Sequence, residues 1–254
     1  MGYGDEIMTT GEVRLLHEQH GQPIRVKYGQ DRGWTHHQAE VFRNNPKIVH
    51  PFSKEGVEFW GRVNGLRPYC VEKTATRWRW REYKPIIGEL YLEQAETEFA
   101  ETLSLDVVLE PNVKGGASPN KDWGWVRWEE LARLLFKEGL HPAHLGPQGT
   151  KRLNCARFVE TRTFRQACAA LTKAKVAVLH EGGLHHAAAV AGVPAVVLYG
   201  GFISPRQTGY DSQVNLFTGG EPCGWRTRCA HCDSAMAKIT PEEVFYKTME
   251  LLRG

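Results

Sequence analysis

The stretch LHEGGLHHAAAVAGVPAVVLYGG, residues 179–201, decides the fold. An apolar segment ends there on Glu181, and a glycine pair, two histidines and a run of alanines follow. An apolar run that stops at a glycine pair predicts a buried strand and a tight turn. The small residues predict a helix that packs closely on a sheet, and the closing PAVVLYGG predicts the next buried strand. The stretch therefore indicates a strand–turn–helix–strand unit with a charged acid at the turn.

The same alternation continues on both sides of this stretch. Further strands are predicted for 106–112 (DVVLEPN), 141–147 (HPAHLGP) and 175–181 (KVAVLHE), and helices for 126–139, 161–174 and 240–252. The last of these helices has Thr240 at the N-cap and Pro241 at the first helical position. Strands that alternate with helices predict an α/β fold with a parallel, doubly wound sheet.

The first hundred residues follow a weaker version of this pattern. We predict a glycine turn entering a helix over 2–21, a strand at 23–29, a helix at 36–45, a strand at 74–85 and a helix at 92–105. In the segment 74–85, Trp78 and Trp80 alternate with arginines, which predicts one apolar and one basic face. A boundary between two domains is expected near residues 100–105.

Composition places the chain among globular proteins and excludes few partners. Its 254 residues suffice for one large domain or two small ones, and 41% are hydrophobic and 24% charged. A net charge of +3 is too small to demonstrate a nucleic-acid partner. No apolar run approaches the roughly 18 residues of a membrane span, and no signal-peptide pattern is visible. We therefore expect a cytoplasmic protein without a membrane span, whose six cysteines are reduced thiols or metal ligands.

Two loops carry side chains that suit a ligand. Glu181 ends a strand, so it is expected at the rim where doubly wound sheets bind ligands, beside a helix N-terminus that suits a phosphate. Alternatively, this is only a tight turn that Glu181 caps, since a glycine pair is a weak signal. A second loop, within 110–131, also joins a strand to a helix and carries Lys114 and Lys121. A lysine there suits a diphosphate, although most loop lysines are simply solvated.

In combination, GGASPNKDWGWVRWEELARLL (115–135) and HEGGLHHAAAVAGVPAVVLYGGFISPRQTG (180–209) resemble glycosyltransferase family 9, the ADP-heptose heptosyltransferase-like enzymes. The opening segment 2–21 looks like that family's glycine–Asp loop, and 222–244 like its cysteine-bearing tail. The resemblance implies a GT-B architecture, in which two Rossmann-like domains with parallel sheets face each other across a cleft. Residues 1–103 would form a reduced acceptor-side domain, and residues 104–254 the domain that binds the nucleotide sugar. Whether the last helix (240–253) packs back on the first domain is left open.

The resemblance also implies roles for individual residues. Asp5 would deprotonate the acceptor hydroxyl as it attacks the anomeric carbon, with inversion and no obligatory metal. Lys121 would neutralise the donor phosphates, Glu181 would hold donor hydroxyls, and the next three amides would meet the diphosphate. His185 matches a histidine on the first helical turn, or else packs against the neighbouring loop. The implied donor-binding set is Ser118, Lys121, Glu181, Gly182, Gly183, Leu184 and His185.

This sequence departs from the family pattern at the site itself. Glu181 stands where the family usually has Asp, and Gly182 where a hydroxyl residue is common, so heptose is not implied. The chain also begins at the glycine–Asp segment, so either its true start lies upstream or the family's first strand is missing. These departures favour an alternative, a degenerate non-catalytic GT-B module that binds a glycan or nucleic acid. An epimerase on the same architecture would need a second acid–base pair, which we do not find.

Cys223, Cys229 and Cys232 cluster near the C-terminus with C-x5-C-x2-C spacing. A structural zinc or iron would fit this spacing if a fourth ligand joined. Neighbouring His231 and Cys232 are not expected to bind one ion together, so buried thiols in a loop over the donor site are the favoured interpretation. The aromatic and basic mixture in RWRWREYK is also typical of single-stranded nucleic-acid grooves, although an amphipathic strand explains it. The acceptor therefore stays open among a glycan, a protein and a nucleic acid such as modified DNA.

Overall fold

Six parallel strands form the main sheet within the residues that the computed structural model describes, which are 2–28, 33–62, 66–114 and 118–254. The strands are β6 (Leu105–Glu110), β7 (Pro142–Gly146), β8 (Arg157–Glu160), β9 (Ala174–His180), β10 (Ala195–Tyr199) and β11 (Val214–Phe217). They lie in the order β8-β7-β6-β9-β10-β11, and every neighbouring pair is parallel. Counted from β6, this is the 3-2-1-4-5-6 order of doubly wound nucleotide-binding sheets. The order reverses between β6 and β9, so a ligand crevice is expected where these two strands end.

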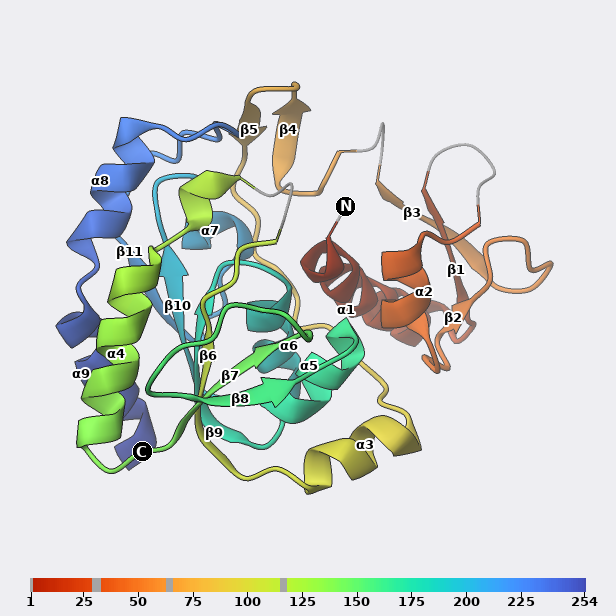
Figure 1. The fold of residues 1–254 in the computed structure, drawn as a ribbon. Coiled ribbons are helices and arrows are strands. Elements are labelled where there is room, and N and C mark those ends of the chain that lie inside the picture. Colours follow the sequence, from red (N-terminus) through yellow and green to blue (C-terminus); the bar gives the residue numbers. More distant parts are fainter. Residues whose placement is uncertain (1, 29–32, 63–65, 115–117) are drawn as a thin grey trace.

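Helices cover both faces of this sheet (Figure 1). They are α4 (Trp125–Lys137) and α9 (Pro241–Arg253) on one face, and α5 (Phe164–Leu171) and α6 (Gly183–Ala191) on the other. Strand residues alternate between the two faces. Val108 of β6 joins the core on the α5–α6 side, whereas Val107 and Leu109 join the core on the α4–α9 side. Apolar residues on both faces explain why the central strands are continuous apolar runs in the sequence.

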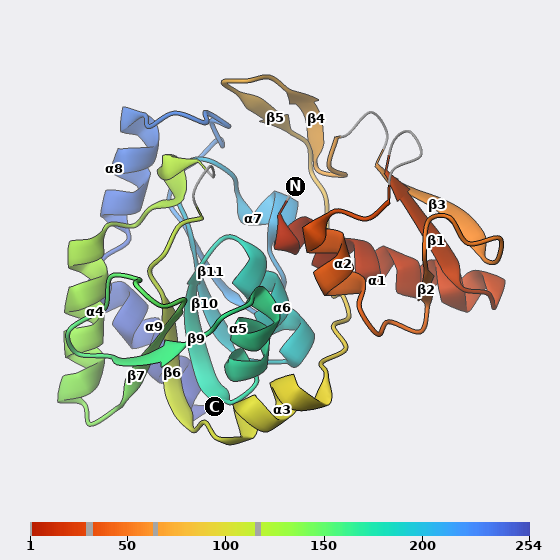
Figure 2. The same cartoon turned by 45° about the vertical axis from the view of Figure 1, so that its right-hand side comes forward.

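A second parallel sheet, in the order β2-β1-β3, lies beside the main sheet (Figure 2). The elements of this part are α1 (Tyr3–His20), β1 (Ile24–Tyr28), α2 (His36–Phe42), β2 (Ile48–Val49) and β3 (Val57–Arg62). Helix α1 connects the two sheets because it packs against α6 as well as against β1 and β3. Its residues Ile7, Met8 and Val13 belong to the same hydrophobic core as the α5–α6 face of the main sheet. The start of α1 is thereby held against the start of α6.

The chain between the sheets forms an antiparallel hairpin of β4 (Cys70–Lys73) and β5 (Trp78–Trp80), and then α3 (Gln94–Glu101). The hairpin lies next to the segment that leads into α8 (Ala230–Lys238), at the top of Figure 1. The two tryptophans of β5 pack against the core, while Arg79 between them is exposed. The predicted alternation of an apolar and a basic face is confirmed.

The predicted α/β fold with a parallel, doubly wound sheet is confirmed, and each predicted strand and helix is present. The strand predicted over 74–85 is shorter than expected, and the edge strands β8 and β11 were not predicted. Also not predicted were α8, the short α7 (Pro205–Thr208) and the 3-10 turn η1 (Pro119–Lys121). The last helix, α9, packs against α4, β9 and β10 and not on the N-terminal elements. Among the described helices, none has the length and apolar character needed to cross a membrane.

Candidate active site

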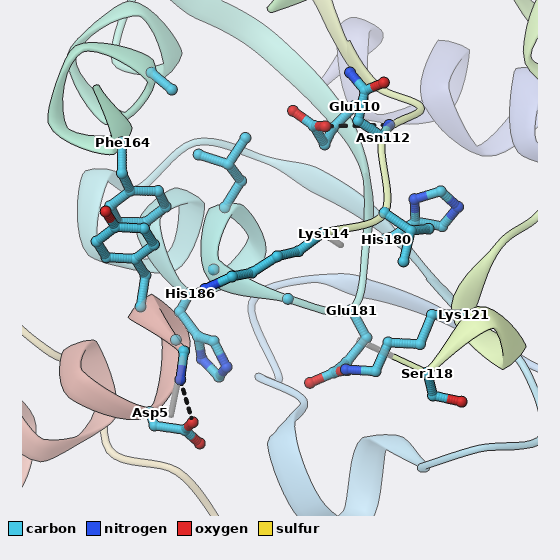
Figure 3. A pocket seen from close by; sticks show the side chains of 18 of the residues that line it. Asp5, Glu110, Asn112, Lys114, Ser118, Lys121, Phe164, His180, Glu181 and His186 are labelled. Carbon is cyan, nitrogen blue, oxygen red and sulfur yellow. Dashed lines mark hydrogen bonds and ion pairs between the residues drawn. The ribbon is translucent and has the colours of Figure 1, made fainter. Parts of the chain in front are cut away.

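A cavity of about 1040 Å³ opens at the carboxyl ends of β6 and β9, facing the start of α1. Its lining includes Asp5 from α1, Lys121 from the loop after β6, and Glu181 from the turn after β9. Figure 3 shows these side chains around one common space. The loop after β6 and the turn after β9 were predicted to lie at one edge of the sheet, and both line this cavity. They follow the two strands between which the sheet order reverses.

Lys121 and Glu181 form an ion pair in the cavity wall (Figure 3). Glu181 is only 7% exposed and follows the last residue of β9, whereas Lys121 ends η1. Burial disfavours the carboxylate of Glu181, but the charges of Lys121 and His185 outweigh burial and lower its pKa below the usual value. The cavity therefore holds a charged carboxylate with a cation in contact with it.

The N-terminus of α6 forms the wall next to this pair, through Gly182, Gly183 and Leu184. A Cβ atom on Gly183 would lie 2.9 Å from the ring of Phe164 and 3.2 Å from Cβ of Tyr3, so the packing here requires glycine. Gly182 has open space around the corresponding position. The dipole of a helix start gives this wall a partial positive charge.

His185 is not among the residues that line the cavity. Its buried ring accepts a hydrogen bond from the Gly182 amide at Nδ1 (2.9 Å) and donates one from Nε2 to the Thr208 carbonyl (2.9 Å). As the third residue of α6, it takes the place of the side chain that reaches back to the N-cap amide in a capping box. The alternative, packing against the neighbouring loop, is the arrangement present. His186 lines the cavity instead, with Nδ1 2.8 Å from the Tyr210 hydroxyl.

Asp5 lies in the first turn of α1 and not in a loop, because the helix already begins at Tyr3. One carboxylate oxygen accepts a hydrogen bond from the Gly2 amide (3.0 Å), as a capping residue does. The Tyr69 hydroxyl donates to the other oxygen (2.6 Å), and Nε of Arg67 lies 2.9 Å from the carboxylate. The Asp5 side chain is thus held in one orientation at the cavity wall.

Arg67 and Tyr69 are site residues that sequence reasoning missed. They precede β4 and lie 62 and 64 positions from Asp5 in the sequence. Burial opposes the charge on Arg67, but Asp5, Tyr69 and Glu181 together outweigh burial and raise the pKa of Arg67. Burial also raises the pKa of Tyr69, with Arg67 acting against it and Asp5 with it, so the hydroxyl keeps the proton that it donates. The segment that carries them shows neither helical nor strand periodicity. The sequence therefore contains no signal that would place these two residues beside Asp5.

The loop after β6 contributes Lys114 and Ser118 to the cavity lining. Ser118 donates its hydroxyl proton to the Trp225 carbonyl (2.9 Å), which anchors the loop. Lys114 extends into the cavity in Figure 3, and its Nζ donates to Nε2 of His37 at 2.7 Å. Residues 115–117, which include the glycine pair of this loop, lie outside the described residues.

Glu110 ends β6 inside the cavity and accepts a hydrogen bond from the Asn112 amide (3.2 Å). Burial raises the pKa of Glu110 to about 8, against the effect of its hydrogen bonds with Asn112. This side chain is therefore mostly a neutral acid at pH 7 and can both donate and accept a hydrogen bond. Two acids at the ends of adjacent strands thus hold opposite protonation states, since Glu181 is charged.

The thiols of Cys223, Cys229 and Cys232 meet outside this cavity, at the start of α8, and His231 joins them. Nδ1 of His231 lies 3.9 Å from Sγ of Cys232. Although His231 and Cys232 are neighbours in the sequence, their ligand atoms and those of the other two cysteines lie within 4.8 Å of one another. The reason is that both belong to the first turn of α8, whose N-cap residue is Cys229.

No protein-family model and no curated protein sequence matches this chain. Among solved structures, a glycosyltransferase family 9 protein from Veillonella parvula superposes with a TM-score of 0.68 at 13% identity, over 100% of this chain and 95% of that one. The ADP-heptose lipopolysaccharide heptosyltransferase II of E. coli gives a TM-score of 0.50 at 22% identity. That match covers 67% of this chain, which spans 55% of the E. coli protein. The predicted resemblance to the fold of glycosyltransferase family 9 is confirmed.

Proposed function

We propose that the protein is an inverting glycosyltransferase that moves a sugar from a nucleoside-diphosphate sugar to an acceptor hydroxyl. The observation that carries the proposal is that one cavity brings together Asp5, the pair of Lys121 and Glu181, and the start of α6. Two solved proteins that share this fold are a heptosyltransferase and a family 9 glycosyltransferase. In the corresponding GT-B arrangement, residues 1–103 form the acceptor side and residues 104–254 the donor side of the cleft.

The donor half of the cavity suits a diphosphate attached to a sugar. The amides at the start of α6 and the ammonium of Lys121 offer positive charge to the phosphates, and this charge stabilises the leaving group as its own negative charge grows. When Lys121 turns to the diphosphate, the carboxylate of Glu181 is free to accept hydrogen bonds from sugar hydroxyls. Glu110, as a neutral acid at the end of β6, adds a donor and an acceptor for the nucleoside.

Asp5 faces this half from the opposite wall and is placed to take the proton of an acceptor hydroxyl. Asp5, Glu181 and His186 line the same cavity, so one ligand would be within reach of all three. Arg67 and Tyr69 hold the carboxylate so that one lone-pair direction can point at the attacking oxygen. Attack from the α1 side, with the diphosphate leaving toward α6, inverts the anomeric carbon.

A transfer assay tests this proposal. The protein is incubated with a mixture of ADP- and UDP-sugars and with glycan, protein and modified-DNA acceptors, and products are found by mass spectrometry. Asp5→Asn should lower the transfer rate by about 10²- to 10⁴-fold, since it removes a general base, and leave donor binding nearly unchanged. Asp106→Asn is the matched control, because Asp106 pairs with Lys175 outside the cavity lining. Transfer by Asp5→Asn at the wild-type rate would show that Asp5 is not the base.

A further inference from the structure

A second group of chemically reactive side chains lies outside the cavity, at the start of α8. Sγ of Cys223 is 3.8 Å from Sγ of Cys229 and 3.3 Å from Sγ of Cys232. Together with Nδ1 of His231, these ligand atoms all lie within 4.8 Å of one another. Four atoms at about 2.3 Å from the centre of a tetrahedron are roughly 3.8 Å apart, so the spacing suits a common tetrahedral centre. A disulfide would need sulfur atoms at about 2.05 Å, much closer than any pair here.

The surroundings of the four side chains prepare them as ligands. His231 donates its Nε2 proton to the Gly219 carbonyl (2.7 Å), which fixes the tautomer and leaves the lone pair of Nδ1 directed at the sulfurs. The Trp225 amide donates to Sγ of Cys223 (3.4 Å), as amides do to metal-bound thiolates. Cys229 is the N-cap residue of α8 and Cys232 lies in its first turn, where the helix dipole favours thiolates.

The geometry points to a zinc site in which Cys223, Cys229, His231 and Cys232 bind one ion with tetrahedral geometry. Three thiolates and one imidazole form a closed set that leaves no position for substrate, which is typical of a structural site. Soft sulfur ligands with one imidazole select zinc over hard cations such as magnesium. The assignment does not rest on the proposed transfer reaction, because none of the four ligands lines the cavity.

Such a site would stabilise the loop after β6, because the segment between Cys223 and Cys229 binds that loop through Asn120. Asn120 donates from Nδ2 to the carbonyls of Trp225 and Thr227 (both 2.8 Å), and its Oδ1 accepts from the Cys229 amide. Asn120 directly precedes Lys121 in η1. The metal would therefore fix the loop against which η1 rests, and through it the position of Lys121.

The same segment also holds the β4–β5 hairpin. The amide of Trp78 donates to the Gly224 carbonyl (2.9 Å), and Nε of Arg77 donates to the Cys223 carbonyl (2.9 Å). A Cβ atom on Gly224 would lie 1.8 Å from the Trp78 carbonyl oxygen. The backbone at Gly224 therefore contacts the backbone of β5 too closely for a side chain at this position. Trp225, the large apolar side chain between Cys223 and Cys229, is 39% exposed, and a metal would supply a cross-link that holds this loop.

Metal analysis of the purified full-length protein tests the site. We expect one equivalent of zinc per chain by plasma mass spectrometry, and thiolate-to-metal charge-transfer bands with tetrahedral d–d absorption after exchange with Co²⁺. His231→Ala and Cys229→Ser should each lose the bound metal after dialysis, whereas Cys155→Ser, at a half-buried free thiol outside the cluster, should retain it. Circular dichroism shows whether each variant is folded.

Three outcomes would overturn the assignment. One is a protein without metal after expression in zinc-supplemented medium and with all six cysteines titrating as free thiols. Another is a disulfide among the three clustered cysteines found by peptide mapping. The third is zinc that remains at full occupancy in both His231→Ala and Cys229→Ser, which would place it elsewhere. The Co²⁺ spectrum of the wild-type chain decides the matter if both variants fail to fold.

Discussion

Asp5 combines a structural role with the chemical role that we propose for it. Its carboxylate caps α1 through the Gly2 amide, and Arg67 and Tyr69 bind it from a segment more than sixty residues away. The resemblance of residues 2–21 to the glycine–Asp loop of glycosyltransferase family 9 selected Asp5 as a candidate. Its partners could not be predicted, because contacts between distant segments leave no periodic signal in either of them.

The contact between Tyr69 and Asp5 leads to a prediction at this scale. Tyr69→Phe keeps the buried ring and removes only the hydroxyl that donates to Asp5. We expect kcat for transfer to fall by about 10- to 100-fold with little change in KM for the donor, since the carboxylate loses its orientation. Tyr246→Phe, at an exposed ring, is the control. A rise in donor KM with unchanged kcat would assign Tyr69 to donor binding instead.

A pH-dependent prediction concerns Glu110. Its pKa in the folded protein is about 8, above the usual 4.5 that it has once the chain unfolds. Between these values the unfolded chain has released the proton while the folded chain keeps it, so Glu110 lowers stability as the pH rises through this window. Glu110→Gln removes the effect. Urea titrations should therefore show that the free energy of unfolding of Glu110→Gln rises relative to that of the wild type between pH 5 and pH 8. A difference between the two proteins that stays constant over this range would refute the raised pKa.

Among the elements, α6 depends most closely on individual residues of its neighbours. Gly183 leaves no space for a Cβ atom between Phe164 and Tyr3, whereas the position of Gly182 is open. Phe164 and Tyr3 stack with ring centroids 3.9 Å apart, so neither ring can withdraw without disturbing the other. The start of α6 is thus fixed against both α5 and α1.

Substitution at the glycine pair tests this packing. Gly183→Ala should lower the free energy of unfolding by about 1–3 kcal/mol, because it overfills a close contact. Gly182→Ala should cost less than about 1 kcal/mol, as a change of N-cap residue from glycine to alanine does. Both values are measurable by urea unfolding at neutral pH. Equal losses for the two variants would contradict the role assigned to Gly183.

The elements also show which parts of the fold the sequence can predict. The centres of β6, β9 and β10 are apolar and buried on both faces, so the positions of these strands and their place in a parallel sheet follow from the sequence. The edge strands β8 and β11 are short and half-exposed, and they lack that signal. Residues 50–88 fold through contacts with α1 and with the loop before α8, so their structure depends on distant partners.

At the scale of the whole molecule, the cavity exists because two sheets share one core. Helix α1 packs on α6, and this contact places Asp5 opposite the cavity wall that Lys121 and Glu181 form. The resemblance predicted both walls, while the lining by His186 in place of His185 followed only from the structure. Consecutive residues of a helix start point in different directions, and the sequence alone does not tell which one faces the cavity.

The account as a whole rests on the binding of a nucleoside-diphosphate sugar between these walls. Isothermal calorimetry with ADP- and UDP-sugars on the wild type and on Lys121→Met measures this directly, with Lys175→Met as the control for charge at a site outside the cavity. We expect the wild type and Lys175→Met to bind at least one of these sugars with equal affinity. Lys121→Met should bind it about 10- to 100-fold more weakly, since it loses a charge-assisted contact with the phosphates. No binding of any nucleotide sugar to the wild type, or equal binding by Lys121→Met, would contradict the account.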